Sequence, residues 1–282
     1  MKTVFIHTNN KQHIGAVLGK FSIERKLPTG SDITVRIINV DNLPAFESFA
    51  GKTYLRGGKE VVYDPLDLQS FTLSRFMPPE EMGFAGRAIV IDPDIFATGD
   101  ITPLMNMDME GRAIAACKKG DSWQSSSMLM DCSKLTHLKI SELLRKLEEK
   151  KLDYTDIMSL KKETSIKEIP SIWNSLDTLT PETKLLHTTN RLTQPWRTGL
   201  PIDFTRSPMP KIFGIIPREP LHKLLGKYPT KYLPHPSKEI EKFFFTLVSD
   251  AMKAGVLTNE KIQIEIDQGH VRKDIFEKIK KI

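Results

Sequence analysis

Gly86-Arg87-Ala88-Ile89-Val90-Ile91-Asp92-Pro93-Asp94-Ile95-Phe96 is the stretch that decides how this chain folds. The run from Ala88 to Ile91 is apolar, continuous and rich in β-branched residues, which is typical of a strand buried on both faces. Asp92 and Asp94 follow where that strand ends. Side chains two residues apart on an extended chain project to the same side, so both carboxylates can reach one cation. Such oxygen ligands suit Mg²⁺ or Mn²⁺, which commonly bind through carboxylates together with the phosphates of a substrate.

Other apolar runs predict further elements of the same fold. The expected elements are strands at residues 3–6, 33–40, 88–91 and 127–130, and an amphipathic helix at 140–147. Strands that alternate with helices predict an α/β fold with a mostly parallel, twisted sheet flanked by helices. Ligands of such sheets bind at the carboxyl ends of the strands, which is where Thr8, Asn9 and Asp92 stand.

The chain changes character after residue 200. Prolines crowd the next stretch and predict an irregular connection, because proline lacks an amide donor and restricts its neighbours. These prolines are Pro201, Pro208, Pro210, Pro217, Pro220, Pro229, Pro234 and Pro236. Ser237 then has the character of a helix N-cap, and the helix that it begins should end near Gly255.

Composition indicates a soluble protein. The 282 residues carry a net charge of +6, and no apolar run is long enough to cross a bilayer. No signal-peptide core follows the N-terminus, and Cys117 and Cys132 cannot form a disulfide framework, so buried thiols and a cytoplasmic location are expected. The basic excess lies mainly in residues 201–282. Within it, residues 271–282 form either a peripheral membrane helix or a helix docked on the rest of the protein.

Several segments occur in the order of a known family. They are Phe71-Thr72-Leu73-Ser74-Arg75-Phe76, the stretch 86–96 with Gly99-Asp100-Ile101, Trp123 to Asp131, Asp153 to Met158, Trp173-Asn174, and Leu185-Leu186-His187 through Gln194-Pro195-Trp196. The ordered set resembles the family 8 retaining glycosyltransferases, the glycogenin and bacterial galactosyltransferase group with a GT-A fold. The resemblance covers roughly residues 1–200 and implies that they form a GT-A catalytic domain. Residues 201–282 would be a Pro-rich connection and a helical C-terminal extension.

The resemblance also implies roles for individual residues. Asp92, Asp94 and His187 would bind the metal ion. An imidazole beside two carboxylates shifts the preference from Mg²⁺ toward Mn²⁺, because nitrogen is a softer ligand than oxygen. Thr8 and Asn9 would contact the nucleotide, and Arg75 the donor sugar.

One departure from the family pattern concerns the phosphates. Gln194 stands where the family has a phosphate-binding lysine. Its amide can donate a hydrogen bond but carries no charge. Arg191 or Arg197 could supply that charge, since a guanidinium suits phosphate oxygens.

Other departures concern the sugar. Gln124 replaces an asparagine of the family and keeps the amide. Tyr154 and Thr155 replace the first two residues of an Asp-Gln-Asp motif, so Asp156 alone matches it. Asp156 either hydrogen-bonds the donor sugar or is a carboxylate favoured at a helix N-terminus. Trp196 is either a substrate platform or a packing anchor.

These features predict a metal-dependent glycosyltransferase. It would transfer a sugar from a nucleotide diphosphate, with uridine implied by the family, to a hydroxyl of a glycan, lipid or protein acceptor. Retention of configuration is implied by the family. Front-face attack is the preferred mechanism, because no residue identifies itself as a covalent nucleophile.

Two alternatives stay open. A sugar-phosphate nucleotidyltransferase would use a similar sheet, but it needs a Gly-rich phosphate loop, and residues 7–20 offer only Gly15 and Gly19. A non-catalytic basic binding module is the second alternative. No nucleic-acid-binding motif is present, so nucleic acid is not expected as its partner.

Overall fold

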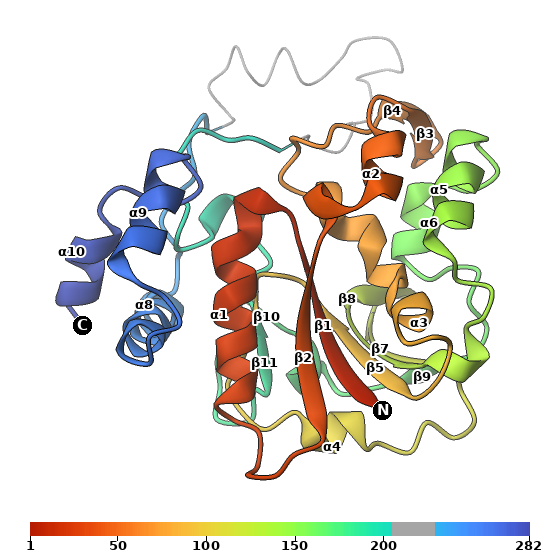
Figure 1. Cartoon of the computed structure of the whole chain (residues 1–282), viewed down its shortest axis with the longest axis horizontal. Helices are drawn as coiled ribbons and strands as arrows, with labels where there is room; N and C mark the ends of the chain where they lie inside the picture. The colour runs from red at the N-terminus through yellow and green to blue at the C-terminus, as the bar shows by residue number, and fades with distance from the viewer. Residues whose placement is uncertain (205–228) are drawn as a thin grey trace.

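The computed structural model describes residues 1–204 and 229–282 (Figure 1). Its largest sheet has six strands in the order β2-β1-β5-β8-β7-β9. These strands are β1 (Lys2–Thr8), β2 (Ile33–Asn39), β5 (Arg87–Ile91), β7 (Ile114–Lys119), β8 (Ser122–Asp131) and β9 (Ile166–Glu168). Only β8 runs against the other strands of this sheet, because it pairs antiparallel with both β5 and β7 while the remaining pairs are parallel. The mostly parallel sheet predicted from the sequence is therefore confirmed.

Two smaller sheets accompany it. Strands β10 (Ser175–Leu176), β11 (Leu185–His187) and β6 (Ile95–Ala97) form one, and β3 (Thr53–Arg56) and β4 (Lys59–Val62) form the other. β6 begins directly after Asp94, and β11 ends at His187. The antiparallel register of β11 and β6 sets His187 opposite Ile95. The small three-stranded sheet thus brings a distant histidine to the turn that follows β5.

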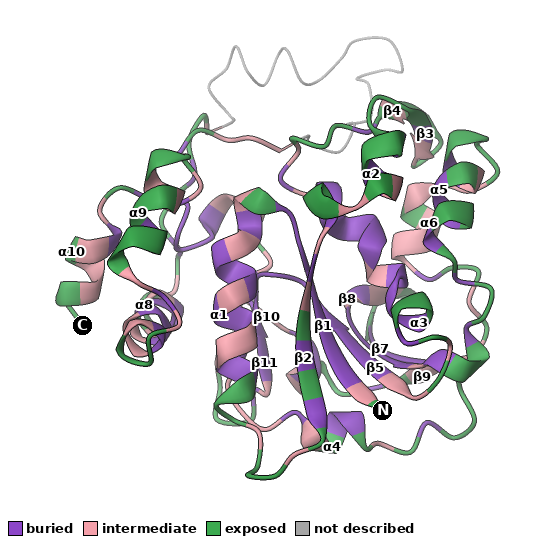
Figure 2. Ribbon diagram, in the orientation of Figure 1, coloured by how far each residue is buried: buried purple, intermediate pink, exposed green. Residues whose placement is uncertain are grey.

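Helices cover both faces of the main sheet. The α-helices are α1 (His13–Glu24), α2 (Pro44–Phe49), α3 (Pro78–Glu81), α4 (Thr102–Met105), α5 (Ile140–Glu148), α6 (Tyr154–Met158), α8 (Lys238–Lys253), α9 (Asn259–Asp267) and α10 (Ile275–Lys280). Short 3₁₀ turns include η1 (Asn10–Gln12), η3 (Ser70–Phe76), η5 (Ser171–Asn174) and η6 (Arg191–Thr193). Val4 and Ile6 of β1 pack on the side of α1, whereas Phe5 packs on the side of α2, η3 and α5. All three side chains are fully buried, and most of β1 has the purple colour of buried residues in Figure 2.

The predicted amphipathic helix at 140–147 is confirmed by α5. It buries four apolar residues, Ile140, Leu143, Leu144 and Leu147. The predicted thiols are also buried and unpaired, and burial raises the pKa of Cys117 and of Cys132 to about 12. Both cysteines are therefore packing residues with protonated thiols at neutral pH.

The C-terminal helices pack on the α1 side of the molecule (Figure 1). Ser237 caps α8 as predicted, since its hydroxyl accepts the Ile240 amide proton at 3.3 Å, and the helix ends just before Gly255, whose φ is +73°. Val271 and Ile275 are fully buried in one apolar cluster with α8 and α1, so the docked alternative for this segment is confirmed there.

Other predictions for the C-terminal part of the chain are only partly met or cannot be checked. The docked part of residues 271–282 does not include Ile282, which is 48% exposed. Four of the prolines used in the sequence argument, at positions 208, 210, 217 and 220, lie outside the described residues. Within 1–204 and 229–282, none of the helices combines the length and apolar character that a membrane span requires.

Candidate active site

The turn Asp92-Pro93-Asp94 joins β5 to β6 and lies against α1. Asp92 and Asp94 are only 5% and 7% exposed. A Cβ atom added at Gly15 would lie 2.5 Å from the carbonyl oxygen of Pro93, so α1 can approach the turn this closely only because residue 15 has no side chain. A Cβ atom added at Gly19 would lie 3.1 Å from the carbonyl oxygen of Ile95. The two glycines of residues 7–20 thus serve the packing of α1 against the acidic turn.

His187 reaches the same place from β11. Its Nε2 lies 3.4 Å from Asp94 Oδ1. Its Nδ1 lies 2.8 Å from the amide oxygen of Asn174, which can only accept, so Nδ1 carries the proton and neutral His187 presents the Nε2 lone pair to the carboxylates. The Asn174 amide nitrogen in turn donates to Gln124 Oε1 at 3.1 Å and to Ser126 Oγ at 3.0 Å. This chain of hydrogen bonds fixes the orientation of the His187 ring and leaves Nε2 facing the carboxylates.

Arg75 from η3 binds the other carboxylate. Its Nε donates to Asp92 Oδ1 at 2.7 Å, and its Nη2 makes a second short contact with Oδ2. Its Nη1 donates to the hydroxyl of Ser125 at 3.0 Å, and that hydroxyl donates to the carbonyl oxygen of Met158 at 2.7 Å. Each carboxylate oxygen has two lone pairs, so Asp92 can still offer one to a cation.

The electrostatics of the cluster favour an additional positive charge. Burial raises the pKa of Asp92 above its ordinary value, and this effect exceeds the opposing influence of Arg75. Burial acts to lower the pKa of His187, but the carboxylates of Asp94 and Asp92 outweigh it, so that pKa is raised. Both shifts show that the cluster favours an added positive charge, which a divalent cation would supply.

The donor set fits a divalent cation. One ligand atom from each of Asp92, Asp94 and His187 lies within 4.8 Å of the others, and all three residues are buried. Asp94 Oδ2 accepts a hydrogen bond from Gln194 Nε2 at 3.0 Å. Asp94 Oδ1 is buried and accepts no hydrogen bond from any residue described. A buried carboxylate oxygen without a donor is costly, and a cation in this position would remove that cost.

These residues border a cleft with a volume of about 260 Å³. Its lining combines side chains from η1, η3, the β5–β6 turn, the β7–β8 hairpin, β11 and the segment that follows β11. They include Gln12, Gln69, Phe71, Arg75, Asp92, Asp94, Lys119, Gln124, Ser125, Ser126, His187, Thr189, Arg191 and Gln194. The cleft opens at the carboxyl edge of β5, which is where the sheet was expected to bind a ligand.

The structure separates the two arginines that were alternatives for binding phosphate. Arg191 lines the cleft, donates to Gln69 Oε1 and lies with its guanidinium carbon 4.4 Å from the ring centre of Phe204. Arg197 is fully buried and makes two bonds to the Asp203 carboxylate, at 2.7 and 2.8 Å. Arg191 is therefore the one of the two that can meet a ligand.

Four predicted site residues are not among the residues that line the cleft. Thr8 is fully buried, and its hydroxyl donates to the carbonyl oxygen of Asn9. The Asn9 amide donates to the carbonyl oxygens of Asp67 and Leu68, and it borders a separate depression at the ends of β1 and β2. Trp196 stacks on Phe244 and meets Phe96 edge-on, in accordance with its alternative as a packing anchor.

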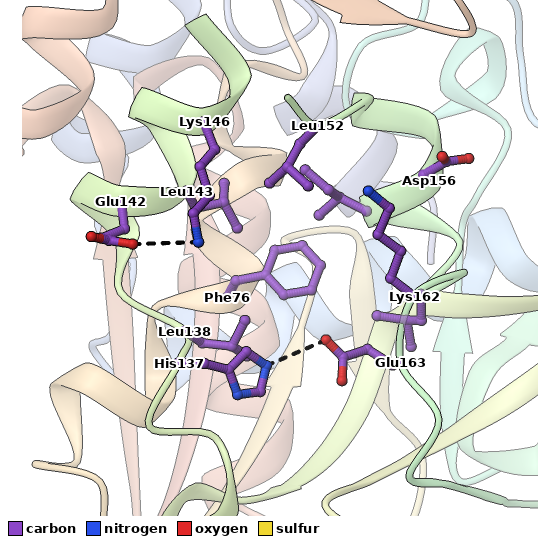
Figure 3. Close-up of a pocket in the computed structure, with 12 residues that line it drawn as sticks. Phe76, His137, Leu138, Glu142, Leu143, Lys146, Leu152, Asp156, Lys162 and Glu163 are labelled. Atoms are coloured by element: carbon purple, nitrogen blue, oxygen red, sulfur yellow. Dashed lines mark ion pairs between the residues drawn. The ribbon is translucent and has the colours of Figure 1, made fainter. Parts of the chain in front are cut away.

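Asp156 is the fourth of these residues. It ion-pairs with Lys161 at 3.1 Å and lines a different pocket, between α5 and α6 (Figure 3). The floor of that pocket is apolar and includes Phe76 and Leu138. Asp156 is at the first turn of α6, as its helix-terminus alternative expected.

Sequence reasoning assigned no role to several residues that the structure places in the site. Asn174, Ser125 and Ser126 lie in the quoted segments, and the resemblance marked their positions without indicating their function. The sequence did not indicate Gln12 or Lys119 as site residues, because a single polar residue after a strand or in a hairpin is common. Their place in the cleft follows only from the packing of separate segments.

Comparisons with known proteins address the fold. No family model matches this chain, and no curated protein matches it. Among solved structures, the bifunctional glycosyltransferase WbbM is similar at a TM-score of 0.50 and 13% identity, over 70% of this chain and 47% of that chain. The galactosyltransferase LgtC, solved with donor and acceptor sugar analogs, gives a TM-score of 0.47 and 15% identity, over 70% of this chain and 89% of that chain. Glycosyltransferase GlyE of Streptococcus pneumoniae gives a TM-score of 0.49 and 15% identity, over 84% of this chain and 65% of that chain.

The architecture is that of the GT-A glycosyltransferase fold, as expected from the sequence. At identities this low, likeness shows the fold alone. Membership of family 8 accordingly stays a resemblance, and the activity has to be argued from the site.

Proposed function

We propose that this protein is a glycosyltransferase that moves a sugar from a nucleotide diphosphate, a uridine diphosphate sugar by the family resemblance, to an acceptor hydroxyl with retention. One observation carries the proposal: Asp92, Asp94 and His187, from two separate parts of the chain, converge in a cleft of a GT-A fold. The acceptor would be a glycan, a lipid or a protein.

A divalent ion, Mn²⁺ in preference to Mg²⁺, would be held by Asp92, Asp94 and His187 and would supply Lewis-acid stabilisation of the departing diphosphate. Asn174 would hold the proton of His187 on Nδ1, so that Nε2 stays free to bind the ion. Gln194, where the family has a lysine, would orient Asp94 through its hydrogen bond. This role differs from the direct nucleotide contact expected from the sequence.

The charge that the family lysine would bring to the phosphates comes in this proposal from Arg191. Its side chain faces the cleft, and it forms no ion pair with any residue in the described ranges. Arg75 would also act near the diphosphate of the donor, because it binds Asp92 and its guanidinium lies at the cleft wall. Preorganised cations of this kind stabilise charge that develops on a leaving group.

The nucleoside would lie toward β1 and β2, in the depression that Asn9 borders. Asn10, Asn39 and Asp41 line that depression at the carboxyl ends of these two strands. Amide and carboxylate groups there offer both donors and acceptors to a base and a ribose. Thr8 would support this edge from below through its bond to Asn9.

On the sugar side, the amide nitrogen of Gln124 has no hydrogen-bond partner among residues 1–204 and 229–282. Its Oε1 accepts from Asn174, which leaves the nitrogen available to donate to a sugar or an acceptor hydroxyl in the cleft. For Asp156 the contact with the donor sugar stays a prediction that requires α6 to move. Its carboxylate borders the pocket of Figure 3 in the structure.

Front-face transfer accounts best for retention in such a cleft. Among the described lining residues the only carboxylates are Asp92 and Asp94, and both are engaged as a ligand pair. The acceptor oxygen would bond to the anomeric carbon on the face from which the diphosphate leaves. As the sugar–phosphate bond breaks, the acceptor proton would pass to a departing phosphate oxygen.

A screen of nucleotide sugars tests the proposal. Each is added with Mn²⁺, and thermal stabilisation and sugar release are measured for the wild type and for Asp94→Ala. We expect a uridine sugar to stabilise the wild type, by about 2.7 kcal/mol at a hundredfold excess over the dissociation constant, and this effect to disappear in the variant. Equal stabilisation of both proteins would contradict the metal role. Stabilisation by no nucleotide sugar would contradict the function.

The nucleotidyltransferase alternative has its own test. Gly15 and Gly19 are occupied in packing α1 against the acidic turn, which leaves no Gly-rich phosphate loop in residues 7–20. Incubation with a nucleoside triphosphate and a sugar phosphate should therefore release no pyrophosphate. Release of pyrophosphate that depends on Asp94 would favour the alternative.

A further inference from the structure

We propose that the acceptor of this enzyme is an anionic sugar, bearing a carboxylate or a phosphate, and that Lys119 recognises its charge. This inference rests on the proposed function and deepens it. It concerns the side of the cleft that faces away from β1, where the donor nucleoside is proposed to bind.

The topology places Lys119 on the acceptor side. β7 and β5 run in the same direction because each pairs antiparallel with β8. β7 therefore ends, at Lys119, on the same edge of the sheet at which β5 delivers Asp92. The strand order is β1-β5-β8-β7, so Lys119 lies beyond the metal ligands when the cleft is followed from β1. Gln124, near the start of β8, lines the cleft between them.

The charges of the cleft leave Lys119 without a counter-charge. The two carboxylates, Asp92 and Asp94, would both bind the divalent ion as ligands. Arg75 already forms an ion pair with Asp92. Asp94 and the two phosphates of the donor would therefore together balance the divalent ion and Arg191. Lys119 is then the one cation left over among the described lining residues. An acceptor with a negative group would complete the balance.

Lys119 is available for such a contact. It is exposed at the rim of the cleft, and the described residues give it no ion pair and no hydrogen bond to its side chain. Its neighbour Lys118 is exposed as well but does not line the cleft, and its amine lies 5.6 Å from the ring centre of Trp123. The two lysines differ in position and not in charge, which makes Lys118 a matched control.

The ligand class follows from the geometry of the rim. A sugar hydroxyl within reach of the anomeric carbon would lie beside the free amide nitrogen of Gln124. An acidic substituent on the same sugar could then meet the ammonium of Lys119, which binds carboxylates and phosphates as a mobile point charge. A charge-assisted hydrogen bond of this type contributes about 1.5–3 kcal/mol, which corresponds to a preference of about tenfold or more over the neutral sugar.

The experiment compares matched sugars on the protein loaded with uridine diphosphate and Mn²⁺. Galacturonate is compared with galactose, glucuronate with glucose, and glucose 6-phosphate with glucose, at constant ionic strength, by calorimetric or thermal-shift titration. The wild type should bind the acidic member of at least one pair about tenfold more tightly. Which pair responds distinguishes a carboxylate from a phosphate.

Three variants complete the test. Lys119→Gln should abolish the preference, Lys119→Arg should retain most of it, and Lys118→Gln should leave it unchanged. The inference is overturned if the wild type shows no preference in any pair, if Lys119→Gln keeps the preference, or if Lys118→Gln loses it equally. Failure of uridine diphosphate and Mn²⁺ to bind at all would instead overturn the proposed function on which the inference depends.

Discussion

Asn174 decides which nitrogen of His187 faces the two carboxylates. Its amide oxygen accepts the Nδ1 proton, and its own amide group is oriented by Gln124 and Ser126. Mutation of a group that orients a metal ligand in this way typically lowers metal affinity by about tenfold to hundredfold.

We expect Asn174→Ala to weaken Mn²⁺ binding by about tenfold or more while the protein stays folded. Calorimetric titration with Mn²⁺ measures this directly, with circular dichroism as the check on folding. Asn259→Ala, at an exposed position of α9, is the control and should bind Mn²⁺ as the wild type does. An unchanged affinity in Asn174→Ala would show that the tautomer of His187 does not depend on this hydrogen bond.

Arg191 and Arg197 provide a second prediction at this scale. Arg191→Gln should reduce affinity for a nucleotide diphosphate and leave the free energy of unfolding almost unchanged, because the guanidinium faces the cleft. Arg197→Gln should lower that free energy by about 1.5–3 kcal/mol, because Asp203 loses its two hydrogen bonds from the guanidinium and keeps those from Lys11 and Tyr232. Urea unfolding and nucleotide titration on both variants separate the two effects. If Arg191→Gln lowered the free energy of unfolding and Arg197→Gln reduced nucleotide affinity, the roles assigned to the two arginines would be wrong.

Helix α1 is the element that fixes the position of the acidic turn. The contact depends on Gly15, where a Cβ atom would lie 2.5 Å from a backbone oxygen, and less strictly on Gly19, where the corresponding distance is 3.1 Å. Backbone atoms cannot move aside as a flexible side chain can. The helix and the turn must therefore separate if a methyl group is added at residue 15.

The expected order of effects follows from these distances. Gly15→Ala should destabilise the protein by about 1–3 kcal/mol and weaken Mn²⁺ binding, although alanine is ordinarily the better helix former. Gly19→Ala should have a smaller effect on both measurements. Denaturant unfolding and Mn²⁺ titration give the two values. If Gly15→Ala stabilised the protein, the close packing of α1 on the turn would be disproved.

Asp203 joins side chains from distant parts of the chain through hydrogen bonds and ion pairs. Asp203 accepts from Arg197, Lys11 and Tyr232. Burial acts to raise the pKa of Asp203, but its partners, chiefly Arg197, outweigh it, and the pKa lies below its ordinary value of 3.8. A depressed carboxylate pKa stabilises the folded state above the unfolded value, and the contribution is lost as the pH falls through the folded value.

A pH series tests this network. Between pH 7 and about pH 5 the wild type should exceed Asp203→Asn in stability by a constant amount, and the difference should shrink as the pH falls below about 4. Urea unfolding at each pH provides the measurement. A difference that stayed constant to pH 3 would show that the charge of Asp203 is not what stabilises this region.

At the scale of the whole molecule, the C-terminal helices pack on the part of the chain that carries the candidate site. Val271 and Ile275 are buried against α8 and α1, and the Arg272 guanidinium donates to the carbonyl oxygen of Pro195, next to Gln194. The backbone amide of Arg272 also donates to the carbonyl oxygen of Trp196, at 2.7 Å. Residues 271–275 thus support the segment in which Gln194 hydrogen-bonds Asp94.

Removal of residues 270–282 is therefore expected to lower the melting temperature and to weaken Mn²⁺ binding. Binding to anionic lipid vesicles should be the same with and without the segment, because its buried apolar residues are used in packing. Thermal unfolding and vesicle co-sedimentation measure the two outcomes. Unchanged stability with loss of vesicle binding would favour the peripheral membrane alternative. The cytoplasmic location stays a prediction from composition.

The sequence by itself determined those features that depend on near neighbours in the chain. The strand before Asp92, the spacing of the two carboxylates, the apolar side of α5 and the cap at Ser237 all follow from short periodic patterns. The ordered motifs added His187 as the third ligand, and the structure places it 3.4 Å from Asp94.

Only the tertiary structure decided which polar groups meet. The choice of Arg191 over Arg197 for the cleft, the alignment of His187 by Asn174, the position of Asp156 in another pocket and that of Lys119 at the rim depend on segments far apart in sequence. The physical reason is that a local pattern sets how one element forms. The hydrogen-bond partner of a side chain is set by how separate elements pack, and no single segment contains that information.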